Sequence, residues 1–161
     1  MEAVVQPLCF ADAPMLAADV ARGVTRLFCR QDLFAICEVP LPNGRRADMM
    51  AICAKGSLTI VEIKVAKADL VGDGKWTDYL HFCDRFYWAV TPQLSAILED
   101  ERYLPQEAGL IVADRYDAAL VREAAHRPLA PARRKAELLR FARRAARRLS
   151  EQFDPTLGSG S

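Results

Sequence analysis

Three charged residues, Asp48, Glu62 and Lys64, stand in apolar segments at a spacing that could build a metal-dependent hydrolytic site. Glu62 and Lys64 lie two positions apart within the strand-like segment 57–65, so both side chains would point to one face of a strand. Because Glu and Lys are common residues, an E-x-K triplet alone also fits a structural salt bridge or a strand edge that meets solvent. A metal site becomes the favoured interpretation only if Asp48 lies beside Glu62.

The loop between the two segments decides whether Asp48 meets Glu62. A three-residue loop that ends at Gly56 would pair Cys53 with Ser57 and place Asp48 directly opposite Glu62. A two-residue loop would shift the register by one and turn Asp48 to the other face. Three-residue hairpin loops favour glycine at their last position, where the backbone is left-handed, so the glycine favours the register in which the carboxylates converge.

Two adjacent carboxylates in a partly apolar site repel each other, and a divalent cation relieves that repulsion. Their hard oxygen ligands suit Mg²⁺ or Mn²⁺. A lysine beside the ion can hold a water molecule and stabilise charge on a phosphoryl oxygen. The arrangement Asp48, Glu62 and Lys64 therefore predicts phosphodiester hydrolysis.

The elements that would position these residues follow from apolar spacing and turn signals. Apolar residues recur at helical spacing over 14–30, where Asp12 is a candidate N-cap and Pro14 fits the first turn. We expect strands over 33–41, 45–53, 57–65, 85–90 and 108–114, and further helices over 73–83 and 130–149. The order α, three strands, α, strand indicates an α/β fold with a mixed sheet flanked by helices.

Length and composition favour one globular domain. The chain has 161 residues, of which 52% are hydrophobic, enough for one core. We expect a single domain over 1–153 and a flexible tail or linker over 154–161. The first residues lack a secretory pattern, and no apolar run reaches the roughly 18 residues that span a bilayer. The expected location is cytoplasmic, with reduced cysteines in the core.

The same segments resemble a known superfamily. The active-site signature of the PD-(D/E)XK nucleases is similar to RRAD at 45–48 followed by VEIKV at 61–65. The chain is also similar to the MmcB-like DNA repair proteins of alphaproteobacteria, and this similarity covers more of it, from about Ala17 to Leu149. The similar segments are LPNGRRADMMAI, IVEIKVAKADLVGDGKW, CDRFYWAV, AGLIVAD and RRKAELLRFARRAARRL. This resemblance implies a restriction-endonuclease-like core of order α-β-β-β-α-β, with an additional basic C-terminal helix.

The resemblance also implies roles for individual residues. Asp48 and Glu62 would be metal ligands together with the backbone carbonyl of Ile63, and Lys64 would be the catalytic lysine. Ala47 stands where the signature has proline, a variation that should leave the ligand in place. The implied cofactor is Mg²⁺ or Mn²⁺.

Two parts of the family pattern are altered. The segment 75–79 is similar to the Q-h-x-x-Y helix motif of the RecB-like branch, but Lys75 replaces the glutamine. Lys75 is therefore a candidate for phosphate contact, and Tyr79 is the best candidate for base stacking among aromatic residues whose spacing suits a core. Many members carry one more acid on the first helix, and the candidates here are Asp19 on that helix and Glu38 on the first strand.

Positive charge is concentrated near the C-terminus. Residues 132–150 carry eight basic side chains and one acidic side chain, a net charge of +7, whereas the whole chain carries +1. These side chains fit either DNA phosphate contact or a solvated helix face braced by ion pairs. Arg45 and Arg46, close to Asp48, are further candidates for phosphate contact.

Taken together, these features favour a Mg²⁺-dependent deoxyribonuclease that acts in DNA repair, with DNA and other repair proteins as partners. The alternative is a non-catalytic module on the same fold that binds DNA or a repair partner. An RNA-directed nuclease is a third interpretation. A homodimer is among the oligomeric states that the sequence allows.

Overall fold

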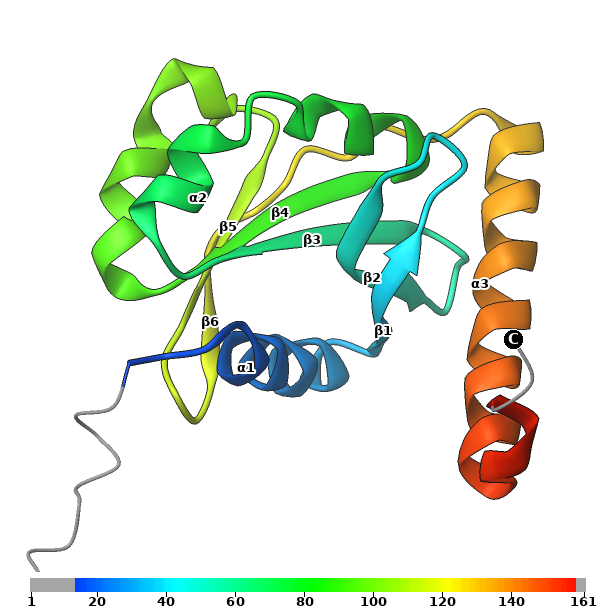
Figure 1. Cartoon of the computed structure of the whole chain (residues 1–161). Helices are drawn as coiled ribbons and strands as arrows, with labels where there is room; N and C mark the ends of the chain where they lie inside the picture. Colours follow the sequence, from blue (N-terminus) through cyan, green and yellow to red (C-terminus); the bar gives the residue numbers. More distant parts are fainter. Residues whose placement is uncertain (1–13, 159–161) are drawn as a thin grey trace, which may run out of the picture.

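The computed structural model describes residues 14–158 and shows a six-stranded sheet with helices on both sides (Figure 1). The strands lie side by side in chain order: β1 Leu33–Pro40, β2 Arg46–Cys53, β3 Leu58–Lys64, β4 Arg85–Val90, β5 Gly109–Ala113 and β6 Ala118–Arg122. Strands β1, β2 and β3 are antiparallel, β3, β4 and β5 run parallel, and β6 returns antiparallel to β5. The sheet is mixed, which confirms the predicted fold class.

Helices cover both faces of this sheet. Helix α1, Ala17–Arg30, packs on one face, and the other face carries α2 (Lys67–Gly72), the 3-10 helices η2 (Trp76–Phe82), η3 (Pro92–Glu99) and η4 (Glu101–Tyr103), and α3 (Pro131–Phe153). A last 3-10 turn, η5, spans Pro155–Gly158. In Figure 1, α3 stands at one side of the domain, next to β1 and β2. Ile60 and Val61 of β3 belong to opposite cores, as the two-residue period of a strand requires.

The hairpin between β2 and β3 has the predicted three-residue loop. The N–H of Gly56 donates to the carbonyl of Cys53 at 3.0 Å, and the N–H of Cys53 donates to the carbonyl of Ser57 at 3.1 Å. Gly56 has a φ of +79°, in the left-handed region that glycine tolerates best. The ladder that follows places Asp48 opposite Glu62, so the predicted register is confirmed.

The helix predicted over 73–83 has a different form. The connection from β3 to β4 contains the short α2 and then a 3-10 helix, η2. Its buried side chains, Trp76, Tyr79 and Phe82, are spaced three residues apart. A 3-10 helix has three residues per turn, so this spacing places all three rings on one face. Packing against the sheet thus explains why the segment is not α-helical.

Three other features differ from the prediction. Strand β6, which the sequence analysis does not predict, is a short edge strand in which exposed and sheltered residues alternate. Helix α1 begins at Ala17 after the extended residue Leu16, three residues later than expected, and Asp12 lies outside the described residues. The tail expected from 154 onwards begins with the ordered turn η5.

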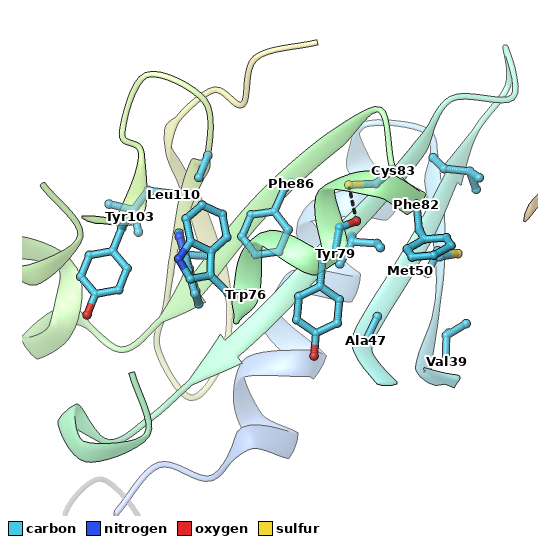
Figure 2. Close-up of a cluster of buried hydrophobic side chains, with 14 of the residues drawn as sticks. Val39, Ala47, Met50, Trp76, Tyr79, Phe82, Cys83, Phe86, Tyr103 and Leu110 are labelled. Carbon is cyan, nitrogen blue, oxygen red and sulfur yellow. Dashed lines mark hydrogen bonds between the residues drawn. The ribbon is translucent and has the colours of Figure 1, made fainter. Parts of the chain in front are cut away.

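The aromatic residues near η2 form a cluster in the core (Figure 2). Trp76 and Phe86 have ring centroids 5.2 Å apart, and Tyr79 stacks on Phe86 at 6.2 Å. Figure 2 shows the hydroxyl of Tyr79 pointing away from this cluster, toward the lower side of the view. The predicted core role of these rings is confirmed, and the cluster fixes η2 against β4.

The cysteines only partly follow the expectation of burial. Cys83 is buried, Cys53 is half-buried, and Cys29 and Cys37 are exposed, so the prediction is wrong for those two. Their positions explain this: Cys29 lies in the last turn of α1, and Cys37 lies on the edge strand β1. Within residues 14–158, no helix is both long enough and apolar enough to cross a membrane.

Candidate active site at the end of β3

An open, mostly polar hollow of about 600 Å³ lies where β3 ends. Its walls come from the start of β2, the last residues of β3, the α2 segment and Tyr79. Asp48, Glu62, Ile63 and Lys64 all line it, so the structure brings the predicted catalytic and metal-binding residues together. The antiparallel pairing of β2 with β3 is responsible, because it places the two carboxylates at neighbouring positions on one face.

Main-chain hydrogen bonds hold the two carboxylates side by side. The N–H of Asp48 donates to Oε1 of Glu62 at 3.1 Å, and the N–H of Ile63 donates to Oδ2 of Asp48 at 2.7 Å. Each carboxylate thus accepts one backbone N–H, from Asp48 or from Ile63, and these bonds brace the pair. This bracing preorganises two negative groups that would otherwise move apart.

Burial and mutual repulsion make this pair hard to ionise. Glu62 is only 3% exposed, and its burial, together with the charge of Asp48, raises its pKa to about 8. Burial also raises the pKa of Asp48 above its ordinary value. Both carboxylates would therefore gain from a bound cation, which favours their charged forms.

The donor set fits a hard divalent cation. The two carboxylates and the carbonyl of Ile63 supply oxygen ligands only, the type that Mg²⁺ and Mn²⁺ prefer. Among the described residues, no group of three or more His, Cys, Asp or Glu side chains is arranged to hold a metal. An ion here would keep several water ligands, as Mg²⁺ usually does in proteins.

Lys64 has a partner that the sequence analysis missed. Its Nζ lies 3.0 Å from Oδ2 of Asp73, and both side chains are sheltered, with 14% and 13% exposure. Asp73 follows α2 between Gly72 and Gly74, and it lines the same hollow. The charge of Asp73 adds to the rise in the pKa of Glu62. No local sequence signal marked this contact, because Asp73 comes nine residues after Lys64 and reaches it only beyond α2.

The two predicted acids for a third ligand lie elsewhere. Asp19 accepts the N–H of Leu16 at 2.9 Å on α1 and does not line the hollow. Glu38 occupies the β1 position across from Asp48, but with a φ of +51° it is left out of the β1–β2 pairing, and its side chain is exposed. The hollow has two further carboxylates, Asp69 and Asp73, and of these Asp73 contacts the lysine.

The predicted nucleic-acid contacts differ in how accessible they are. Arg46 is 64% exposed and lies 4.0 Å from Glu38, whereas Arg45 is held by Asp78 at 3.2 Å. The Tyr79 hydroxyl donates to the carbonyl of Arg46 at 3.1 Å, and burial raises the pKa of Tyr79. Because the ring stacks on Phe86 and Tyr79 is only 6% exposed, little of the ring is accessible to a base.

Neither Lys75 nor the basic helix α3 lines the hollow. Lys75 is exposed but does not line it. On α3, Arg148 donates to the carbonyl of Glu38 at 2.7 Å, and Arg147 pairs with Glu151 at 2.8 Å. Others that bond within the chain are Arg133, Arg134 and Arg140. These contacts favour the braced-helix interpretation of α3.

Fold and site together define a class of protein: an α/β domain with a six-stranded mixed sheet, consistent with a restriction-endonuclease-like fold. The chain belongs to the MmcB-like family, because the family model described as DNA repair protein MmcB-like matches residues 6–156. A solved structure described as SPO1766, a protein of unknown function from Silicibacter pomeroyi, is similar, with 42% identity and a TM-score of 0.78. That match covers 89% of this chain and 94% of the other. No curated protein matches the chain.

Proposed function

We propose that this protein is a metal-dependent deoxyribonuclease of the PD-(D/E)XK type that hydrolyses DNA phosphodiester bonds during repair. The observation that carries the proposal is the braced pair of Asp48 and Glu62, which shares one open hollow with Lys64. Membership of a DNA repair family supports DNA as the substrate. Its partners would be DNA and other repair proteins.

Each residue of the hollow would have its own role in the reaction. Asp48, Glu62 and the Ile63 carbonyl would hold Mg²⁺ or Mn²⁺, which lowers the pKa of a bound water and acts as a Lewis acid. The Lys64 ammonium would stabilise negative charge on the phosphoryl oxygen as it develops. Asp73, at 3.0 Å from Lys64, would orient that ammonium as a positioning residue. Arg46 is exposed at the rim and suited to a backbone phosphate.

One observation favours a second candidate, a non-catalytic module that binds DNA or a repair partner. The ion pair between Lys64 and Asp73 satisfies the lysine without any substrate. A vestigial site with a purely structural lysine would show the same contact.

Cleavage assays separate the two candidates. Purified protein is incubated with duplex, single-stranded, flapped and branched DNA, in Mg²⁺, in Mn²⁺ and in EDTA. The nuclease predicts metal-dependent cleavage of at least one DNA and its loss in Asp48→Asn. Asp69→Asn is the matched control, because Asp69 also borders the hollow but is exposed on α2. Absence of metal-dependent cleavage on every DNA would overturn the proposal in favour of the binding module.

A further inference from the structure

Helix α3 has an apolar face that the domain does not cover. Of its 23 residues, only Glu137 and Phe141 are buried. On another face, apolar residues recur at alternating steps of three and four: Leu139, Ala142, Ala146, Leu149 and Phe153. We call these five residues the α3 seam. Leu139, Leu149 and Phe153 are 60%, 68% and 93% exposed, so the large side chains of the seam meet solvent.

The spacing and width of the α3 seam indicate what could cover it. Alternating steps of three and four are the heptad pattern with which one helix packs against another. The seam is also narrow, as a coiled-coil contact is, whereas a helix that lies on a membrane has a wider apolar face. Alanines at two of its five positions would let a second helix approach closely. The seam therefore fits a helix better than a lipid surface.

A shallow hollow at the end of the seam adds an anchoring point. Leu157 of η5, itself 59% exposed, lines it together with Leu149 and Phe153. Its volume is about 570 Å³, and few of the lining atoms are polar. Interfaces commonly place a large apolar or aromatic side chain in such a hollow.

Charge along one border of the α3 seam selects the kind of helix. Arg140, Arg143 and Arg147 follow one another at steps of three and four beside the seam. Arg147 pairs with Glu151 at 2.8 Å and Arg140 pairs with Glu137, so the three arginines of the border exceed their two acidic partners by one positive charge. A second copy of this chain would bring the same arginines into contact with them, which is unfavourable. DNA would match the arginines, but it would leave the exposed Leu and Phe side chains uncovered.

We propose that the α3 seam docks an acidic amphipathic helix of a partner protein. Apolar residues of the partner would cover the seam, and one would fill the hollow at Leu157. Its Glu or Asp side chains would face Arg140, Arg143 and Arg147. The surface is separate from the hollow at β3, so this interaction does not depend on catalysis.

A designed peptide tests the proposal. The probe is a fluorescein-labelled peptide of about 21 residues, three heptads with Leu at the apolar positions and Glu beside them. Fluorescence anisotropy with the full chain measures its binding. For the wild type we expect a dissociation constant of about 100 µM or lower. Two double variants, Leu149→Ser/Phe153→Ser and Arg143→Glu/Arg147→Glu, should each bind the peptide about tenfold more weakly. The controls Val121→Ser on β6 and Arg22→Glu on α1 also change exposed side chains and should bind like the wild type.

Four results would overturn the proposal. The first is no binding at about 1 mM peptide, and the second is equal binding of a peptide with Lys in place of Glu. The third is binding of the acidic peptide to the seam variants as tight as to the wild type. The fourth is a dimer in sedimentation velocity that the Leu149→Ser/Phe153→Ser variant no longer forms. A dimer would assign the seam to a second copy. Loss of binding to duplex DNA or to phosphatidylserine vesicles in that variant, with peptide binding unchanged, would assign it to those surfaces instead.

Discussion

Asp84 lies beside the first residue of β3 and Glu62 lies near its last, and the surroundings of these two buried carboxylates differ sharply. Asp84 accepts the N–H groups of Leu58 and Leu129, both at 2.8 Å, and a two-pronged ion pair from Arg134 at 2.7 and 2.5 Å. Burial alone would raise the pKa of Asp84, but these hydrogen bonds lower it below its ordinary value. Its charge is fully compensated within the chain.

At the other end of the strand the chain leaves negative charge uncompensated. Glu62 faces a second carboxylate, and the nearest ammonium, on Lys64, is paired with Asp73. Its pKa rises to about 8, the opposite direction to that of Asp84. A satisfied carboxylate stabilises the fold, whereas an unsatisfied pair costs stability and persists at sites that bind or react. The comparison favours a structural role for Asp84 and supports the proposed metal site at Asp48 and Glu62.

Removing Asp84 should have the largest effect on stability. Asp84→Ala removes the acidic partner of Arg134 and the acceptor of the Leu58 and Leu129 N–H groups, and it should lower the free energy of unfolding by about 3 to 5 kcal/mol. Because the pKa of Asp84 is lowered in the folded state, its contribution is complete above the ordinary value of 3.8 and is lost as the pH falls through the folded pKa. Urea unfolding at pH 7, with Asp69→Ala as control, measures the effect. A loss of less than about 1 kcal/mol in the free energy of unfolding would contradict the structural role of Asp84 and its contrast with Glu62.

Lys64→Ala should affect the rate rather than the fold. The lysine acts on transition-state charge, so turnover should fall by about 10² to 10³, while Mn²⁺ binding by the two carboxylates is retained. Single-turnover cleavage and thermal melts measure the two effects. Lys67→Ala, exposed at the start of α2, is the control. A large drop in melting temperature with unchanged turnover would make Lys64 a structural partner of Asp73.

Glu62→Gln should stabilise the metal-free protein. The folded pKa of about 8 lies above the ordinary value of 4.5, so the folded state binds more protons and its stability falls as the pH rises between these values. The amide removes that penalty. In EDTA, the gain in melting temperature should be small near pH 5 and should increase up to about pH 8. A variant that is destabilised equally at both pH values would contradict an unsatisfied Glu62.

Arg46→Gln should have the smallest effect, on DNA affinity alone. One lost phosphate contact lowers the slope of log affinity against log salt by about one unit, for all sequences alike. Fluorescence anisotropy across a salt series measures the slope. Arg22→Gln on α1, where Arg22 is 53% exposed, should leave it unchanged. An unaltered slope in Arg46→Gln would mean that Arg46 does not contact phosphate and only forms a surface ion pair with Glu38.

Local sequence features predict much of the fold and of the candidate site. Gly56 predicts the three-residue loop of the hairpin, and the register of that loop is enough to bring Asp48 to Glu62. Other features depend on tertiary packing that no local pattern encodes. The 3-10 form of η2 follows from its rings packing against β4, and the role of Asp73 follows from α2 folding back over β3. Two α3 arginines also have partners far away in the sequence: Arg134 binds Asp84, and Arg148 binds the carbonyl of Glu38.

Calorimetric titration of the metal-free protein with Mn²⁺ at pH 7 tests most directly whether the unsatisfied carboxylates form a metal site. The account predicts saturable binding to wild type, affinity weakened by about tenfold or more in Asp48→Asn, and unchanged affinity in Asp69→Asn. Lys64→Ala should bind like the wild type, because the lysine is not a ligand. No Mn²⁺ binding up to about 1 mM, or equal affinity in wild type and Asp48→Asn, would contradict the account.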